Sequence, residues 1–194
     1  MRLLSGRRPA WLIEPVVSLL AALRVTPAQL TVVGLLGNVG AAVLVGRGSL
    51  LAGGLLVLAA SALDLLDGAL ARATGRATPF GALLDSMFDR LSEAVVLFGV
   101  LVYVSGRGER EQVLLVFVAA IGSLLVSYVR ARAEGEGVAL TAGLFTRPER
   151  VALLAASLIT GWLRLGLWLL AVLTSLTVAQ RLWLALRAVE RRRP

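Results

Sequence analysis

The sequence predicts an all-α integral membrane protein: six transmembrane helices preceded by an N-terminal interfacial amphipathic helix. Three observations predict this fold class. Of the 194 residues, 58% are apolar and only 16% are charged, and the mean hydropathy is +0.84. Soluble domains are nearer one quarter charged. Apolar segments, most near the roughly 20 residues that cross a bilayer, fill more than half of the chain. We therefore expect a single membrane domain over residues 1–194.

The N-terminal segment, residues 1–25, predicts a helix lying along the membrane surface. Arg7, Arg8 and Glu14 alternate with apolar side chains such as Trp11. This mixture is too charged for a spanning helix but suits an interfacial one. The segment lacks the small-residue cleavage site of a signal peptide.

Six apolar stretches, separated by short polar breaks, predict the spanning helices. Pro27 suits the first turn of the first of them, and Arg164 separates the last two. Together they form a bundle over about residues 27–188, followed by a basic tail at 189–194. We expect the helices over residues 28–45, 50–73, 80–104, 111–133, 147–163 and 167–187.

The arginines predict the orientation in the membrane. All 20 basic residues are arginine and the net charge is +8. Basic residues near span ends concentrate in the cytoplasm. With six spans, one side would receive both termini and most arginines, whereas the other side receives only Arg47, Arg107, Arg110 and Arg164. Both termini and the loops 74–79 and 134–147 are thus expected to be cytoplasmic. We expect a plasma-membrane protein, and its basic charge does not imply nucleic-acid binding.

The residue types present restrict the chemistry. The sequence contains no cysteine and no histidine. Thiolate nucleophiles, zinc–sulfur sites and imidazole bases are excluded. Carboxylates, arginines, hydroxyls and the backbone must carry any reaction.

All four aspartates, Asp64, Asp67, Asp85 and Asp89, lie on two helices that flank one short cytoplasmic turn. The spacings i,i+3 and i,i+4 place each pair on one helical face, and the short turn makes the two helices antiparallel neighbours. Intramembrane carboxylates are costly unless paired or solvated. Oxygen ligands favour Mg²⁺ or Mn²⁺, and two such ions bridged by carboxylates could clamp a phosphoryl group. These residues therefore predict a metal site for phosphoryl chemistry.

Two other interpretations of the aspartates stay open. They could pair with Arg72, Arg76 and Arg90 in a structural ion network. They could also form the cation site of a small membrane transporter. The cluster lies near one end of the spans, however, and no second acidic station continues through the membrane.

The spacing from Asp64 reads Asp-x2-Asp-Gly-x2-Ala-Arg-x8-Gly-x3-Asp-x3-Asp. This resembles the signature of the CDP-alcohol phosphotransferase family, with every fixed position present. The likeness extends over nearly the whole chain. The matching residues are Asp64, Asp67, Gly68, Ala71, Arg72, Gly81, Asp85 and Asp89.

The resemblance implies roles for the aspartates. Asp64, Asp67 and Asp85 would bind two Mg²⁺ ions, with Mn²⁺ as the alternative metal. Asp64 and Asp85 would be the bridging ligands. Asp89 would be the general base and would also touch the second ion. The reaction would move a phosphatidyl group from a CDP-linked lipid, such as CDP-diacylglycerol, to an alcohol and release CMP.

The resemblance also implies a donor site. Gly68 would let the nucleotide approach the helix, Arg72 would hold its diphosphate, and Thr78 would make a further contact. Gly68 could instead serve helix packing, and Arg72 could simply extend to the membrane surface. The stretch of Pro27, Ala28, Gln29 and Leu30 would complete the donor site, with Ala28 where the family usually has asparagine.

Arginines near the end of the fourth predicted helix and on the fifth and sixth suit an acceptor that already carries a phosphate. Ser127-Tyr-Val-Arg-Ala-Arg-Ala-Glu134 is similar to the inositol-phosphate branch of the family, and Arg130, Arg132, Arg150 and Arg181 would bind that phosphate. Glycerol 3-phosphate or another alcohol is the alternative acceptor, and these arginines could instead mark the cytoplasmic boundary. The family likeness further implies a homodimer among membrane lipids.

Overall fold

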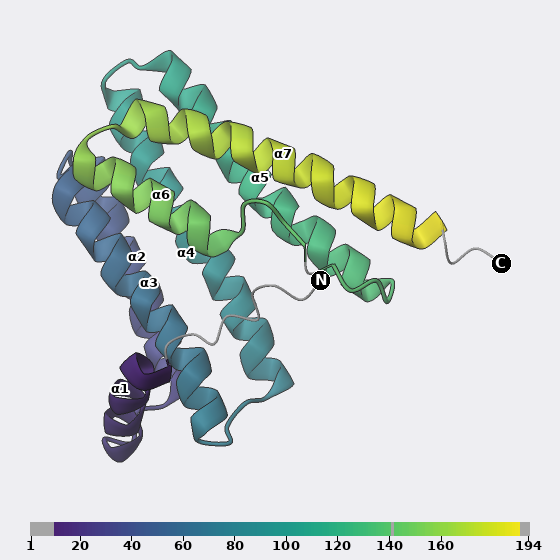
Figure 1. Ribbon diagram of the computed structural model, residues 1–194. Coiled ribbons are helices and arrows are strands. Elements are labelled where there is room, and N and C mark those ends of the chain that lie inside the picture. Colours follow the sequence, from purple (N-terminus) through teal and green to yellow (C-terminus); the bar gives the residue numbers. More distant parts are fainter. Residues whose placement is uncertain (1–9, 141, 191–194) are drawn as a thin grey trace.

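Seven helices make up the described part of the chain in the computed structural model (Figure 1). The structure describes residues 10–140 and 142–190, with side chains from residue 14 onward. The described residues contain no strand, so the all-α prediction is confirmed. The helices are α1 (Ala10–Ala22), α2 (Pro27–Gly46), α3 (Leu50–Ala73), α4 (Pro79–Gly106), α5 (Arg110–Gly135), α6 (Arg147–Thr160) and α7 (Leu163–Glu190).

Three helices start in the same way. Thr26, Thr78 and Thr146 stand at the N-caps of α2, α4 and α6, and each helix has a proline in its first turn. The Gln29 side chain accepts a hydrogen bond from the Thr26 amide at 2.8 Å, and Glu149 accepts one from the Thr146 amide at 2.9 Å. Such caps satisfy donors that the first helical turn leaves free. Local sequence therefore determines where these three helices begin.

Helix α2 packs against both α3 and α4 and separates them over most of their length. Gly99 of α4 explains the close approach, because a Cβ there would lie 2.7 Å from the Cα of Ala42 on α2. Helices α3 and α4 contact each other only slightly, although residues 74–78 connect them directly. The expectation that they would be packed neighbours was wrong, and the small residues where α2 meets α4, Gly99 and Ala42, are the reason.

The remaining helices complete the bundle from the other side. Helix α6 packs against α3 and α7, and α5 packs against α4 and α7. Figure 1 shows α5 and α7 running side by side away from the α2, α3 and α4 group. The apolar core contains fully buried side chains from all of these helices, such as Val45, Val57, Val100, Val116, Leu158 and Leu167.

Helix α1 lies against the end of the bundle that carries Asp67. Val17 packs with Leu30 of α2 and Leu70 of α3, and all three side chains are buried. Leu19 of α1, and Leu23 directly after it, are exposed and do not belong to this packed cluster. The segment is therefore a short helix with one packed apolar face, and its position at a membrane surface stays a prediction. Residues 1–9 of the predicted segment lie outside the described residues.

Four helices are long and apolar enough to cross a membrane: α2, α3, α5 and α7. Six spans are not confirmed. Helix α4 has the length but carries Asp85, Asp89, Arg90 and Glu93 in its first half. Helix α6 ends at Thr160 after 14 residues, about 21 Å, which is short of the roughly 30 Å hydrocarbon core. Large apolar side chains such as Phe98, Leu114 and Phe117 cover the outside of the bundle, as in a membrane protein.

Candidate active site

Arg147, the first residue of α6, joins two of the four aspartates. Its Nη2 lies 2.6 Å from Asp64 Oδ2 on α3, and its Nη1 lies 2.7 Å from Asp89 Oδ1 on α4. The Asp64 side chain is 6% exposed and that of Asp89 is 27% exposed. The structure therefore brings together aspartates from two helices that scarcely touch, and α6 supplies the link.

Asp67 and Asp85 flank this pair. Asp67 is buried and accepts a hydrogen bond of 2.7 Å from the Thr31 hydroxyl on α2. Asp85 is half-buried and lines the same cavity as Asp89. Thr31 was missed from sequence, although it lies one turn after Pro27 and hydrogen-bonds its carbonyl oxygen at 3.0 Å.

The donor set fits a hard divalent cation, because it consists of carboxylates from two helices. A positive group already lies between Asp64 and Asp89, namely the Arg147 guanidinium. Among the described residues, no three carboxylates are arranged to hold an ion as they stand. A metal that used these same two oxygens would have to replace the guanidinium as their partner.

The structural ion network expected as an alternative does not form with the predicted arginines. Within the described residues no ion pair joins an aspartate to Arg72, Arg76 or Arg90. Arg90 donates to Ser86 on its own helix. The charge that compensates the aspartates comes from Arg147, 83 positions from Asp64 in sequence.

Gly68 faces space that only Arg72 approaches. A Cβ on Gly68 would meet Arg72 Nη1 at 3.4 Å and no atom of another helix. The helix-packing interpretation of Gly68 is therefore wrong. Arg72 is exposed at the end of α3, so Gly68 and Arg72 together leave an open surface beside Asp67 on which a ligand could lie.

The other predicted donor residues also have local structural roles. Thr78 is exposed, and its hydroxyl accepts from the Gly81 amide at 3.0 Å, which fixes the start of α4. Gln29 is used in the cap of α2. Leu30 is buried against α1 and α3. Pro27 and Ala28 lie in the first turn of α2, close in sequence to Thr31.

A cavity of about 440 Å³ opens beside the aspartates, between α4, α5, α7 and the start of α6. Asp85 and Asp89 line one part of it. The arginines that line it are Arg90, Arg130, Arg147, Arg150 and Arg181. The cavity is large enough for a small polar molecule, and its two kinds of charge can act on different parts of that molecule.

Arg150 and Arg181 are held rigidly in this cavity. Arg150 is 2% exposed and donates to both carboxylate oxygens of Glu93 at 2.6 and 2.7 Å. Arg181 is 4% exposed and donates to the carbonyl oxygens of Val126 at 2.7 Å and Ala142 at 3.1 Å. Sequence analysis missed Glu93, whose only signal was a charge inside an apolar helix.

The side chains of Arg130 and Arg132 lie in different surroundings. Arg130 lines the cavity and pairs with Glu134 at 2.9 Å. Arg132 does not line it; its side chain is 64% exposed and pairs with Glu136 at 2.6 Å. Side chains two positions apart on a helix point to different faces, so Arg130 faces the cavity and Arg132 does not. The prediction that Arg132 lies with the cavity arginines was wrong.

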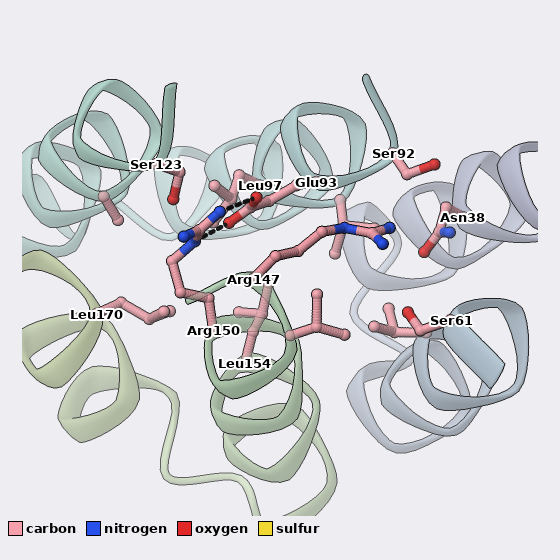
Figure 2. Close-up of a pocket in the computed structure, with 14 residues that line it drawn as sticks. Asn38, Ser61, Ser92, Glu93, Leu97, Ser123, Arg147, Arg150, Leu154 and Leu170 are labelled. Carbon is pink, nitrogen blue, oxygen red and sulfur yellow. Dashed lines mark hydrogen bonds and ion pairs between the residues drawn. The ribbon is translucent and has the colours of Figure 1, made fainter. Parts of the chain in front are cut away.

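A second, smaller cavity of about 20 Å³ lies deeper, behind Arg147 and Arg150. Figure 2 shows Arg147 extending from α6 toward Asn38 and Ser61, while Arg150 turns to Glu93. The space is close to that of one water molecule. Polar side chains, including Ser92 and Ser123, make up about half of its lining.

Comparison with known proteins decides the family. The family model for CDP-alcohol phosphatidyltransferase matches residues 24–183. The chain belongs to this family. It is an enzyme of the transferase class in membrane-lipid synthesis, and the transporter interpretation is not supported.

Named relatives cover nearly the full chain. The phosphatidylinositol phosphate synthase of Mycobacteroides abscessus is 38% identical, over 93% of this chain and 86% of the relative. The archaetidylinositol phosphate synthase of Pyrococcus horikoshii is 37% identical, over 92% and 93%.

A solved structure supports the same assignment. The Mycobacterium tuberculosis phosphatidylinositol phosphate synthase with CDP-DAG bound superposes with a TM-score of 0.83 at 33% identity, over 89% of this chain and 92% of that one. The same synthase has also been solved in complex with manganese and citrate, again with a TM-score of 0.83.

Proposed function

We propose that this transferase moves a phosphatidyl group from a CDP-linked lipid to a hydroxyl of inositol phosphate and releases CMP. The observation that carries the proposal is the single cavity in which Asp85 and Asp89 lie near Arg150 and Arg181. The carboxylates suit a metal-assisted attack, and the arginines suit a phosphate that the acceptor already carries. The named relatives differ in their lipid but share inositol phosphate in their names, which supports this acceptor.

In the proposed reaction Asp89 takes the proton from the acceptor hydroxyl. The hydroxyl oxygen then bonds to the lipid-side phosphorus of the donor, and the bond from that phosphorus to the CMP oxygen breaks. Divalent cations at Asp64, Asp67, Asp85 and Asp89, two Mg²⁺ ions in our proposal, would neutralise the diphosphate and the charge on the leaving CMP. Gly68, Arg72 and Thr78 would hold the nucleotide end of the donor.

The proposed topology completes the assignment. Helices α4 and α6 would complete the six spans, with their polar faces turned to the cavity. Helix α6 would cover about 21 Å of the hydrocarbon core. Both termini and the cavity would face the cytoplasm, where the arginine bias places them. We further propose a homodimer.

The experiment is an assay of CMP release by the purified, detergent-solubilised protein with CDP-diacylglycerol and Mg²⁺. Inositol phosphate, glycerol 3-phosphate and free inositol are compared as acceptors. We expect release that depends on inositol phosphate. Release with glycerol 3-phosphate alone would contradict inositol phosphate as the acceptor. Release with free inositol would show that the acceptor needs no phosphate, and would contradict the proposed role of the arginines.

A further inference from the structure

The side chain of Arg147 is surrounded by groups that the proposed metals would need. Its Nη atoms contact Asp64 at 2.6 Å and Asp89 at 2.7 Å. Its Nε is buried and has no hydrogen-bond partner. A guanidinium prefers to use all of its donors when it is buried. The two carboxylates are therefore the protein groups that hold this guanidinium in its present position.

Arg150, one turn further along α6, behaves differently. Both of its hydrogen bonds go to Glu93, which is not among the aspartates proposed to bind metal. A metal ion at the aspartates would remove the partners of Arg147 and leave those of Arg150 intact. Figure 2 shows the two side chains diverging from α6 in this way. Of these two arginines, metal binding would therefore release Arg147 and leave Arg150 in place.

The Arg147 side chain lies between two cavities, so it has space in which to change its position. It lines both the deep space of about 20 Å³ and the acceptor cavity of about 440 Å³. The larger cavity also holds Arg150 and Arg181. A rotation of one long side chain about its own bonds can move the guanidinium between the two, with no movement of α6.

We propose that Arg147 is an internal counter-cation of the aspartate cluster: divalent metal displaces it, and the released guanidinium then binds the phosphate of the acceptor. This inference rests on the proposed function of the site. Without metal, Arg147 neutralises Asp64 and Asp89. With metal bound, its guanidinium becomes available to the acceptor phosphate beside Arg150 and Arg181.

The proposal couples the two substrates' sites thermodynamically. One carboxylate oxygen cannot serve a metal ion and a guanidinium equally, so Arg147 lowers metal affinity when no acceptor is present. Because coupling is reciprocal, metal must then raise the affinity for the acceptor phosphate. Couplings between sites commonly amount to about 5- to 150-fold.

The first test measures Mn²⁺ binding to the substrate-free protein by titration calorimetry. Arg147→Gln is compared with wild type and with Arg164→Gln. Arg164 is a matched control because it pairs with Glu111 across α7 and α5, away from the aspartates. We expect Arg147→Gln to bind Mn²⁺ about tenfold or more tightly and Arg164→Gln to match wild type. Equal or weaker binding by Arg147→Gln would overturn the proposal.

The second test uses thermal unfolding, which also works if Arg147→Gln is poorly stable without metal. The melting temperatures of wild type and Arg147→Gln are measured in EDTA and in Mn²⁺. We expect the increase caused by Mn²⁺ to be larger for Arg147→Gln, because unpaired aspartates destabilise only its metal-free form. Arg147→Lys, which keeps the charge, should resemble wild type. An increase in Arg147→Gln no larger than that of wild type would contradict displacement.

The third test measures binding of inositol 1-phosphate with and without Mn²⁺. Wild type should bind it about fivefold or more tightly with Mn²⁺, and Arg147→Gln should lose most of this gain. An unchanged gain in Arg147→Gln would overturn the transfer of Arg147 to the acceptor. The metal titration contains no substrate, so its result stands apart from the assay of CMP release. Failure of the proposed function would appear as absent release, and failure of this inference as unchanged metal affinity.

Discussion

Replacing Glu93 with glutamine should reduce both the stability of the fold and the affinity for the acceptor. Glu93 binds the guanidinium of Arg150 through two bonds of 2.6 and 2.7 Å, and the two side chains are 9% and 2% exposed. Glutamine keeps the shape but removes the negative charge. Arg150 would then be a buried cation with one neutral acceptor.

The size of the effect follows from this geometry. Removing one partner of a buried ion pair costs about 3–5 kcal/mol. The glutamine oxygen can still accept one hydrogen bond, worth about 1 kcal/mol. The net loss in the free energy of unfolding is therefore about 2–4 kcal/mol. For a chain of this size each kcal/mol shifts the melting temperature by about 2–4 °C, which gives a decrease of at least about 4 °C.

The assay is thermal unfolding of the purified protein in detergent, with Glu111→Gln as the matched control. Glu111 pairs with Arg164 where both side chains are well exposed, so its loss should change the melting temperature little. The double variant Glu93→Gln with Arg150→Met should recover part of the stability, because no unpaired charge is left.

Two results would refute this reasoning. One is a melting temperature of Glu93→Gln equal to that of Glu111→Gln. The other is a double variant less stable than Glu93→Gln alone. In the CMP assay Glu93→Gln should also raise the KM for the acceptor more than that for the donor, and equal increases would show that Glu93 does not act through Arg150.

Three further predictions address other parts of the site. Asp89→Asn should lower turnover about a hundredfold or more while donor binding persists, and wild-type turnover would exclude Asp89 as the base. Arg181→Ala should weaken inositol phosphate binding about tenfold or more, measured by calorimetry, whereas Arg132→Ala should leave it unchanged; the reverse order would contradict the cavity assignment. Leu70→Ala should lower the free energy of unfolding by about 2–5 kcal/mol, because Leu70 of α3 is 0% exposed and packs with Val17 of α1 and Leu30 of α2. A neutral result in denaturant unfolding would show that this contact is unimportant.

Local sequence predicted most of the helices. Apolar length indicated α2, α3, α5 and α7, and Pro27 indicated the first turn of α2. The spacing of the aspartates placed each pair on a helix near the turn at residues 74–78. Such signals depend on neighbouring residues, so one sequence is enough to detect them.

Long-range contacts could not be predicted in the same way. Arg147 reaches Asp64 across 83 positions, and Arg150 reaches Glu93 across 57. Nothing in the spacing of a charged residue states which distant charge it will meet. The position of α2 between α3 and α4 has the same origin, because it depends on the fit of Gly99 to Ala42. Chain connectivity alone favoured the wrong pair of neighbours.

The threonine caps of α2, α4 and α6 have a consequence for how anions are held. All three helices begin at the end of the bundle that holds the aspartates. Thr31 of α2 contacts Asp67, Arg147 of α6 contacts Asp64, and α4 carries Asp89. Each helix N-terminus carries a partial positive charge of about half a unit from its aligned peptide dipoles. Helix α3 ends at Ala73, close to the start of α4, and its C-terminus carries the opposite partial charge. The start of α6 lines the cavity with Thr146 and Pro148, so its dipole is the one that acts on a phosphate bound there. This contribution from the α6 backbone should remain in variants that lack one arginine.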